Sequence, residues 1–155
     1  MVRDWFSRAR YIVSLGDSGV SEADGAEALY AAAFTAMKNA YAPYSQFRVG
    51  AALRSVDGAV SVGCNVENSA FPAGICAERS ALAAAVAAGH RAFDLLLVVT
   101  EAKDPTPPCG LCRQALVEFG TNLGVVSATA SGERAEWSMR DLLAQPFTPA
   151  SLTHS

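Results

Sequence analysis

The segment FDLLLVVT, residues 93–100, restricts the possible folds of this chain more than any other. It is a nearly continuous apolar run with the length of a single strand, and it lacks the alternation of a strand that has one face in water. A strand of this kind has to be covered on both faces, as happens when a sheet lies between two layers of helices. The sequence therefore predicts a layered fold with this strand inside its sheet.

The segments around this run supply the other elements. Helical spacing of apolar residues predicts helices over residues 26–40, 75–88 and 109–119, with a short closing helix capped by Ser138. The dipeptide Asp57-Gly58 predicts a tight hairpin turn. The remaining strands are expected in FRVGAAL (47–53), VSVGCNV (60–66), GVVSATA (124–130) and RAEWS (134–138). We therefore expect the α/β class, a three-layer α/β/α sandwich with a mixed five-stranded sheet.

The chain is long enough for one hydrophobic core. Its 155 residues are 51% hydrophobic and 17% charged, which argues against disorder, and no apolar run is long enough to cross a membrane. We expect an amino-terminal arm over residues 1–24, with a short helix around Trp5, and a single domain over residues 25–155. The arm lacks a secretory signal, so the sequence predicts a cytoplasmic protein with no membrane partner.

The charge distribution argues against a nucleic-acid partner. Twelve basic and fifteen acidic residues give a net charge of −3, and the basic residues do not cluster. Proteins that follow a phosphate backbone need a concentrated Lys and Arg surface. We therefore expect a small-molecule substrate.

The motif PPCGLCRQ places two cysteines at the start of a predicted helix. Cys109 and Cys112 are three residues apart, which puts both thiols on one helix face. Such a pair is compatible with a metal site, a redox couple or chance. In a reducing compartment, a disulfide is the least expected of these outcomes.

A third cysteine favours the metal site. Cys76 opens a second helix, so two helix amino termini could direct three thiols at one point. Three protein ligands are typical of a catalytic zinc ion, which keeps one position open, whereas structural zinc usually has four. None of the other candidates is well placed as a fourth ligand: Cys64 fits a small buried residue, His90 follows the far end of its helix, about 20 Å away, and His154 lies in the tail.

Two charged residues follow Cys76 within one helical turn. Glu78 could accept a proton from a water activated by zinc and pass it to a substrate, although a glutamate at a helix start is also common for purely electrostatic reasons. Arg79 is three residues from Cys76 and could donate hydrogen bonds to the thiolates. We hypothesise that Arg79 offsets their negative charge.

These motifs together resemble a known family. AYAPYSQFRVGAAL, GCNVENSAFPAGICAERSAL, PPCGLCRQ and DLLAQPFTPASL resemble the small homotetrameric cytidine deaminases of nucleoside salvage, over about residues 26–152. The resemblance implies one zinc ion per chain bound by Cys76, Cys109 and Cys112, with Glu78 as the catalytic acid and base. It implies the hydrolytic deamination of cytidine and 2′-deoxycytidine.

The resemblance also implies how a nucleoside would bind. Asn65 and Glu67 match the residues that hold the ribose 3′-hydroxyl, and a carboxylate there would disfavour a phosphate. Phe47 would pack against the pyrimidine, although a core aromatic is an equal alternative for this position. The backbone around Ala77 would contact the edge of the base.

Two aromatic positions imply a shared site between subunits. Phe71 and Phe147 match residues through which neighbouring chains complete each other's pockets, so we expect a homotetramer. One departure is that the family commonly has Tyr at the position of Phe71. The next three residues, Pro72, Ala73 and Gly74, are also smaller than usual.

Three other functions stay open at this point. One is an aminohydrolase of the same fold that acts on a different aminopyrimidine or on a nucleoside antibiotic, for which the FPAG loop is the only indication. Another is a non-catalytic module stabilised by zinc. A third is a thiol redox protein that uses Cys109 and Cys112, which would not need a metal.

Overall fold

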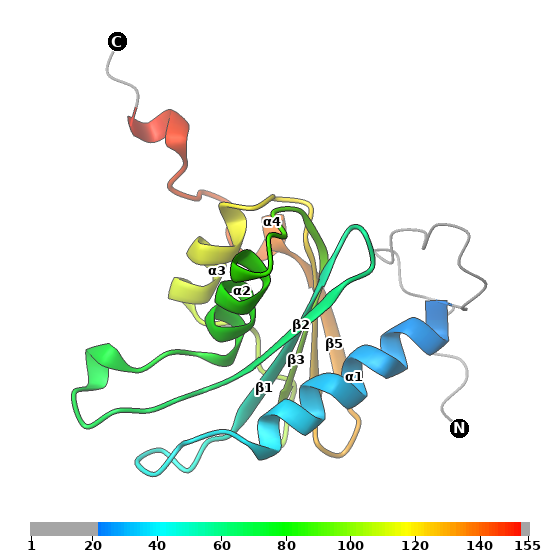
Figure 1. Ribbon diagram of the computed structural model, residues 1–155, viewed down its shortest axis with the longest axis vertical. Coiled ribbons are helices and arrows are strands. Elements are labelled where there is room, and N and C mark those ends of the chain that lie inside the picture. Colours follow the sequence, from blue (N-terminus) through cyan, green and yellow to red (C-terminus); the bar gives the residue numbers. More distant parts are fainter. Residues whose placement is uncertain (1–21, 153–155) are drawn as a thin grey trace.

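The computed structural model describes residues 22–152 as a five-stranded mixed sheet with helices on both faces (Figure 1). The strand order across the sheet is β2-β1-β3-β4-β5. β1 pairs with β2 and with β3 in antiparallel fashion, β3 and β4 are parallel, and β4 and β5 are antiparallel. The strands are β1 (Val49–Ser55), β2 (Val60–Cys64), β3 (Phe93–Thr100), β4 (Gly124–Thr129) and β5 (Arg134–Ser138). The predicted α/β class and mixed sheet are confirmed.

The apolar run of residues 93–100 forms the central strand, β3. Seven of its eight residues are buried, and Asp94 is partly buried. Leu96 and Val98 face one hydrophobic core while Leu97 and Val99 face the other. A strand between two cores cannot show polar alternation, which explains the composition of this segment.

The helices divide between the two faces of the sheet (Figure 1). α1 (Glu22–Lys38) covers one face, and α2 (Ala77–Ala87), α3 (Gly110–Val117) and α4 (Met139–Leu142) cover the other. Within residues 22–152, no helix combines the length and the apolar character that crossing a membrane requires. The helix predicted around Trp5 lies outside the described residues.

Two glycines let helices approach the sheet closely. A Cβ atom at Gly50 would lie 2.0 Å from the Ala33 carbonyl oxygen of α1, and one at Gly63 would lie 2.3 Å from the Ala81 nitrogen of α2. Both distances are far shorter than a non-bonded contact allows. The absence of a side chain at Gly50 therefore lets α1 pack closely against the sheet, and Gly63 does the same for α2.

Several helix boundaries differ from the prediction. α1 begins at Glu22, four residues earlier than expected, because the prediction starts at the first residue of the apolar spacing, Ala26, and takes the preceding residues as a polar connector. Cys76 and Cys109 are the N-cap residues of α2 and α3, so each helix proper begins at the residue after its cysteine. Two short 3₁₀ helices, Phe71–Ala73 and Pro149–Leu152, lie in segments without a predicted element. The Ser138 cap of α4 is confirmed, with a reciprocal bond to Asp141.

Candidate metal centre and its pocket

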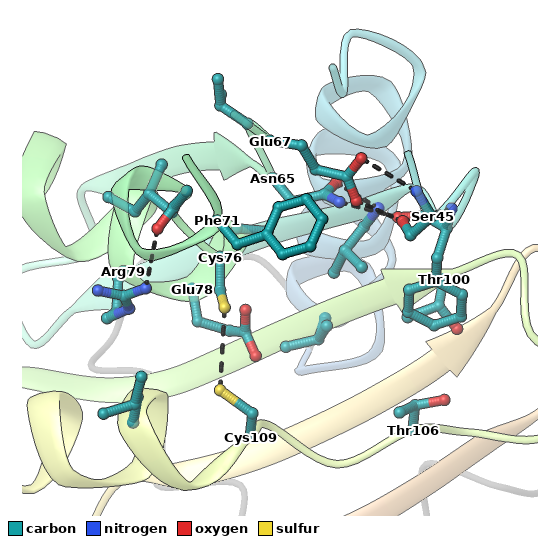
Figure 2. Close-up of a pocket in the computed structure, with 18 of the residues that line it drawn as sticks. Ser45, Asn65, Glu67, Phe71, Cys76, Glu78, Arg79, Thr100, Thr106 and Cys109 are labelled. Atoms are coloured by element: carbon teal, nitrogen blue, oxygen red, sulfur yellow. Dashed lines mark hydrogen bonds between the residues drawn. The ribbon is translucent and has the colours of Figure 1, made fainter. Parts of the chain in front are cut away.

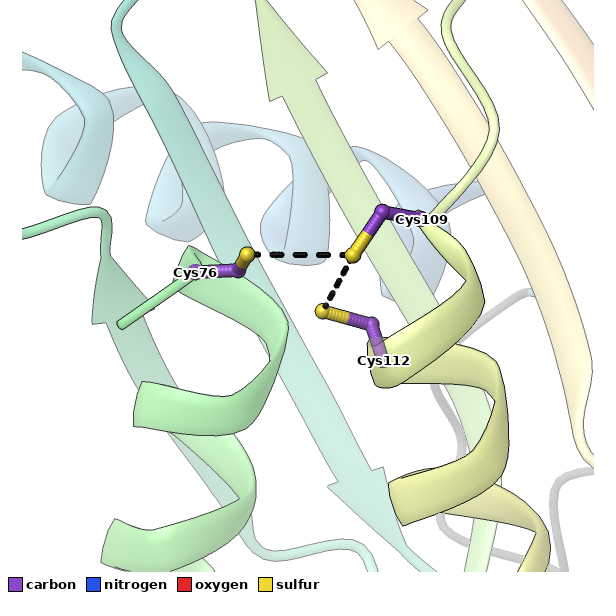
Figure 3. A group of neighbouring side chains, drawn as sticks. All are labelled: Cys76, Cys109 and Cys112. Carbon is purple, nitrogen blue, oxygen red and sulfur yellow. Dashed lines mark hydrogen bonds between the residues drawn. The ribbon is translucent and has the colours of Figure 1, made fainter. Parts of the chain in front are cut away.

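Three cysteines meet between the amino termini of α2 and α3 (Figure 3). The Sγ atoms of Cys76 and Cys109 are 3.8 Å apart, and those of Cys109 and Cys112 are 3.5 Å apart. All three lie within 4.8 Å of one another. Among residues 22–152, no other group of three or more cysteine, histidine or acidic side chains is close enough to share an ion.

Local structure explains why these thiols converge. The N-cap residue has an extended backbone, so the side chains of Cys76 and Cys109 project from the end of their helices rather than along the sides. Cys112 is buried, one turn into α3. Each helix amino terminus carries partial positive charge, which favours thiolates.

The donor set fits a zinc ion. With zinc–sulfur bonds of about 2.3 Å and tetrahedral angles, ligand sulfurs lie about 3.8 Å apart, which is close to the spacing observed here. Hydrogen bonding from Cys112 lowers the pKa of Cys76 to about 5, although burial opposes this shift, and Arg79 adds to it. The same hydrogen bond, together with burial, raises the pKa of Cys112. The thiolate is the form of cysteine that binds a metal, so Cys76 is the thiol most ready to do so.

Glu78 lies in the first turn of α2, beside this cluster. Its side chain is only 5% exposed, and it lines the pocket described below. Burial raises the pKa of its carboxyl group, and the charge of Cys76 adds to the effect. An elevated pKa is what a group needs in order to accept and return protons near neutral pH.

Arg79 follows on the same turn and faces the sulfurs. Its guanidinium donates to the carbonyl oxygen of Gly74 at 3.4 Å, and hydrogen bonding with Cys76 raises its pKa. Its Nε is buried without a hydrogen-bond partner among the described residues. The side chain therefore places a fixed positive charge beside the thiols.

A cavity of about 770 Å³ opens beside Cys76 and Cys109 (Figure 2). Glu78, Cys76 and Cys109 form one end, and the loop of residues 44–49 lies at the other. The cavity is lined by most of the residues that the sequence predicts for a site, namely Phe47, Asn65, Glu67, Phe71, Cys76, Ala77, Glu78, Arg79 and Cys109.

Asn65 and Glu67 hold the loop of residues 44–49 through their side chains. The Asn65 amide donates to the Phe47 carbonyl oxygen at 2.8 Å and accepts from the Val49 N–H at 2.8 Å. The Glu67 carboxylate accepts from the N–H groups of Tyr44 and Ser45 and from the Ser45 hydroxyl. The hydrogen bond from Ser45 lowers the pKa of Glu67, with the two backbone bonds adding to it.

The two aromatic positions expected at a subunit boundary lie apart. Phe71 is 75% exposed at the rim of the cavity, where its ring meets that of Tyr44 edge to face at 5.9 Å. Phe147 is 58% exposed and is not part of this cavity. Gln114 of α3 anchors the Phe147 backbone by accepting from its N–H and donating to its carbonyl oxygen.

Sequence reasoning missed several polar residues of the cavity. Ser45, Thr100 and Thr106 line it, yet none belongs to a metal or acid–base motif. Ser45 belongs to the motif PYSQF. The only signal for its role would have been its position between Tyr44 and Phe47, which also line the cavity. Thr100 ends the central strand, where a polar residue after an apolar run marks the edge of the sheet.

The remaining candidate ligands do not reach the cluster. Cys64 is half-buried at the end of β2, and His90 pairs with Asp57 at 3.3 Å beyond the carboxyl end of α2. Neither belongs to the group of three thiols, as the sequence predicts. His154 lies outside the described residues.

The comparisons with known proteins agree with this geometry. Residues 24–128 match the family described as "Cytidine and deoxycytidylate deaminase zinc-binding region". The chain belongs to this family. Its matched segment contains the three thiols and Glu78.

Individual relatives match over most of their length. The chain is similar to the cytidine deaminase of Sporosarcina psychrophila, with 41% identity over 130 residues, 83% of this chain and 96% of that protein. It is similar to the crystal structure of cytidine deaminase from Burkholderia pseudomallei, with 48% identity, a TM-score of 0.75 and coverage of 78% of this chain and 98% of that one. The crystal structure of cytidine deaminase from Mycobacterium leprae matches with 38% identity, a TM-score of 0.67 and coverage of 77% of this chain and 97% of that one.

Proposed function

We propose that this protein is a zinc-dependent cytidine deaminase that converts cytidine and 2′-deoxycytidine to uridine and 2′-deoxyuridine with release of ammonia. The observation that carries the proposal is the convergence of three thiols from two helix amino termini beside a buried Glu78 in one cavity. A structural zinc site would have no need for a buried carboxylate facing an open pocket. A redox couple would have no need for the third thiol.

Cys76, Cys109 and Cys112 would hold one zinc ion per chain. When bound, zinc lowers the pKa of a coordinated water, which makes a nucleophile available near neutral pH. Three thiolates donate electron density, which would weaken the lowering of the water pKa. Arg79 offsets their negative charge and so helps to keep that pKa low. The three residues and Arg79 together set the charge of the centre.

Glu78 would move the protons of the reaction. The water oxygen bonds to C4 of the pyrimidine while one of its protons passes through Glu78 to ring N3. The second proton then passes through Glu78 to the amino group, the bond from C4 to that nitrogen breaks, and ammonia leaves. Burial favours the protonated form of Glu78 between these two transfers.

Phe47, Asn65, Glu67 and the backbone of Ala77 would bind the nucleoside. Phe47 is 39% exposed at the rim and offers a ring face for the base. The Glu67 carboxylate is suited to accept from a sugar hydroxyl and would repel a phosphate. This supports a free nucleoside, rather than a nucleotide, as the substrate.

We also propose a homotetramer in which neighbouring chains complete each other's pockets. Phe71 and Phe147 are both exposed apolar rings, and Phe147 is held in place by Gln114 without lining the pocket of its own chain. Residues 25–155 would act as one catalytic domain. The cytoplasm is the proposed location because the site needs reduced thiols.

The ultraviolet change on mixing zinc-replete protein with cytidine tests the proposed activity. The parent is expected to form uridine, and Glu78→Gln protein with normal zinc content is expected to lose about 10²- to 10⁴-fold in kcat. Deamination of cytidine that survives complete metal removal would contradict the dependence on zinc. A folded, zinc-bearing parent that leaves cytidine unchanged would favour another amine-bearing substrate.

A further inference from the structure

The Ser45 hydroxyl joins the two parts of the pocket that would bind a nucleoside, and nothing in the reaction itself requires it. It donates to Oε1 of Glu67 and accepts from the N–H of Phe47 at 3.0 Å. Glu67 is 22 residues away along the chain, whereas Phe47 is two residues away. One hydroxyl group therefore connects the carboxylate proposed for the sugar with the backbone of the residue whose ring is proposed for the base.

Ser45 donates a hydrogen bond to each oxygen of the Glu67 carboxylate and so helps to fix its orientation. Oε2 accepts from the Tyr44 N–H at 2.8 Å and from the Ser45 N–H at 3.1 Å, while Oε1 accepts from the Ser45 hydroxyl. Hydrogen bonds to an ionised carboxylate are stronger than those between neutral groups. With both oxygens engaged, the plane of the carboxylate is fixed relative to the cavity.

The position of Phe47 depends on a turn with an unfavourable backbone. Gln46, between Ser45 and Phe47, has a φ of 56°, a left-handed conformation that is uncommon for residues other than glycine. The bond from the Phe47 N–H to the Ser45 hydroxyl closes this turn on one side. Asn65 closes it on the other through the Phe47 carbonyl oxygen.

We propose that Ser45 is a positioning residue that fixes the Glu67 carboxylate and the Phe47 ring in the relative geometry needed to bind the sugar and the base of one nucleoside. This inference rests on the proposed function. Without the hydroxyl, Oε1 of Glu67 and the N–H of Phe47 each lose a partner, so the carboxylate can turn and the strained turn can relax. Recognition of the sugar 3′-hydroxyl would then weaken, while the metal centre would be untouched.

The test measures kcat and KM for cytidine and for 3′-deoxycytidine with four proteins: the parent, Ser45→Ala, Ser45→Thr and Ser138→Ala. Ser138 is a matched control because its hydroxyl also donates to a carboxylate, that of Asp141 at 2.6 Å, and accepts a backbone N–H, at 3.1 Å. It caps α4 and does not line the cavity. Ser45→Thr keeps a hydroxyl at the position under test.

For the parent, we expect kcat/KM to be about 10- to 100-fold higher for cytidine than for 3′-deoxycytidine, the worth of one charge-assisted hydrogen bond. Ser45→Ala should lose most of this preference, mainly through a higher KM for cytidine. Ser45→Thr should restore it, and Ser138→Ala should keep it even if the protein is less stable. Zinc content should be the same in all four proteins.

The outcomes separate this inference from the proposed function. If Ser45→Ala lowers kcat/KM by the same factor for both substrates, Ser45 is merely structural and the inference fails, although the deaminase function stands. A parent without preference for the 3′-hydroxyl also overturns the inference. A parent that deaminates neither nucleoside overturns the proposed function, and this inference with it.

Discussion

The two ends of the cavity are built in different ways. The metal end consists of Cys76, Glu78, Cys109 and Cys112, which lie at the N-cap positions and in the first turns of α2 and α3, two helices that pack against the sheet. The loop end, consisting of residues 44–49 with Asn65 and Glu67, is held by hydrogen bonds from side chains to an exposed backbone. On the proposed function, the chemistry is therefore placed on helices packed against the sheet, and the recognition on a loop held by side-chain hydrogen bonds.

This difference predicts that damage at one end leaves the other largely intact. Changes at the metal end should alter metal content and kcat, because they affect the groups proposed to act on the reacting atoms. Changes at the loop end should alter KM, because they affect contacts made equally in the ground state and the transition state. The following experiments test this separation.

The largest effect is expected from Cys112→Ser, with Cys64→Ser as its control. Cys112 is fully buried in the cluster, whereas Cys64 lies at the end of β2 outside it. Cys112→Ser should lose both its zinc and its activity, because oxygen replaces a thiolate ligand. Cys64→Ser should keep both. Metal analysis and the ultraviolet assay check this; equal zinc in the two variants would contradict the assignment of the ligands.

The next largest effect is expected from substitution of the two glycines that let α1 and α2 pack closely against the sheet. Gly63→Ala and Gly50→Ala should each destabilise the protein by about 1–3 kcal/mol or more, because the new methyl group overlaps helix backbone. Gly63 lies against α2, so its variant should also bind zinc more weakly. Gly50 lies against α1, which leads into the loop end, so its variant should instead raise KM.

Urea unfolding, zinc affinity measured against a competing chelator and steady-state kinetics distinguish these two variants. The separation holds if the loss of zinc affinity is confined to Gly63→Ala. If Gly50→Ala loses as much zinc affinity as Gly63→Ala, the two ends are mechanically coupled through the sheet.

A smaller effect is expected from Phe47→Ala. Stacking of a base on an aromatic ring contributes about 1–3 kcal/mol, so KM for cytidine should rise by about 10-fold or more while zinc content stays normal. Phe34→Ala is a suitable control, because Phe34 stacks on Tyr30 of α1 and does not line the cavity. A fall in kcat at unchanged KM would show that Phe47 does not act in recognition of the nucleoside.

The smallest effect is expected in the titration of Glu67. Hydrogen bonding from Ser45 lowers its pKa below the ordinary value of 4.5, so Ser45→Ala should raise it again. Since the folded pKa is the lower one, the contribution of this carboxylate to stability is present above pH 4.5 and is lost as the pH falls through the folded pKa. Carboxyl carbon NMR over this range measures the midpoint, and an unchanged midpoint in Ser45→Ala would show that the hydroxyl does not hold Glu67.

The sequence predicts the metal end better than the loop end, for a physical reason. Cys109 and Cys112 are three residues apart, so local helix geometry alone brings their thiols together, and Cys76 and Glu78 are only two residues apart at the start of α2. The bond between Ser45 and Glu67 spans 22 residues and depends on the left-handed Gln46. No periodicity indicates such a turn at a glutamine.

The fold shows the same limit. The apolar run of β3 predicts a covered central strand, but it does not say which helix covers which face. The sequence places the starts of α2 and α3 slightly too early, because cysteine is not among the usual N-cap residues and so Cys76 and Cys109 give no capping signal. It places the start of α1 too late, because Glu22 and Asp24 resemble a connector.

The most direct test of two separate ends is a pair of matched substitutions, Glu78→Gln and Glu67→Gln, each of which replaces a carboxylate of the cavity with an amide. Values of kcat and KM for cytidine would be measured with both proteins at equal zinc content. Glu78→Gln should lose kcat by about 10²- to 10⁴-fold with little change in KM, and Glu67→Gln should raise KM with a much smaller change in kcat. The same pattern of losses in both variants would contradict the division of the cavity into a chemical end and a recognition end.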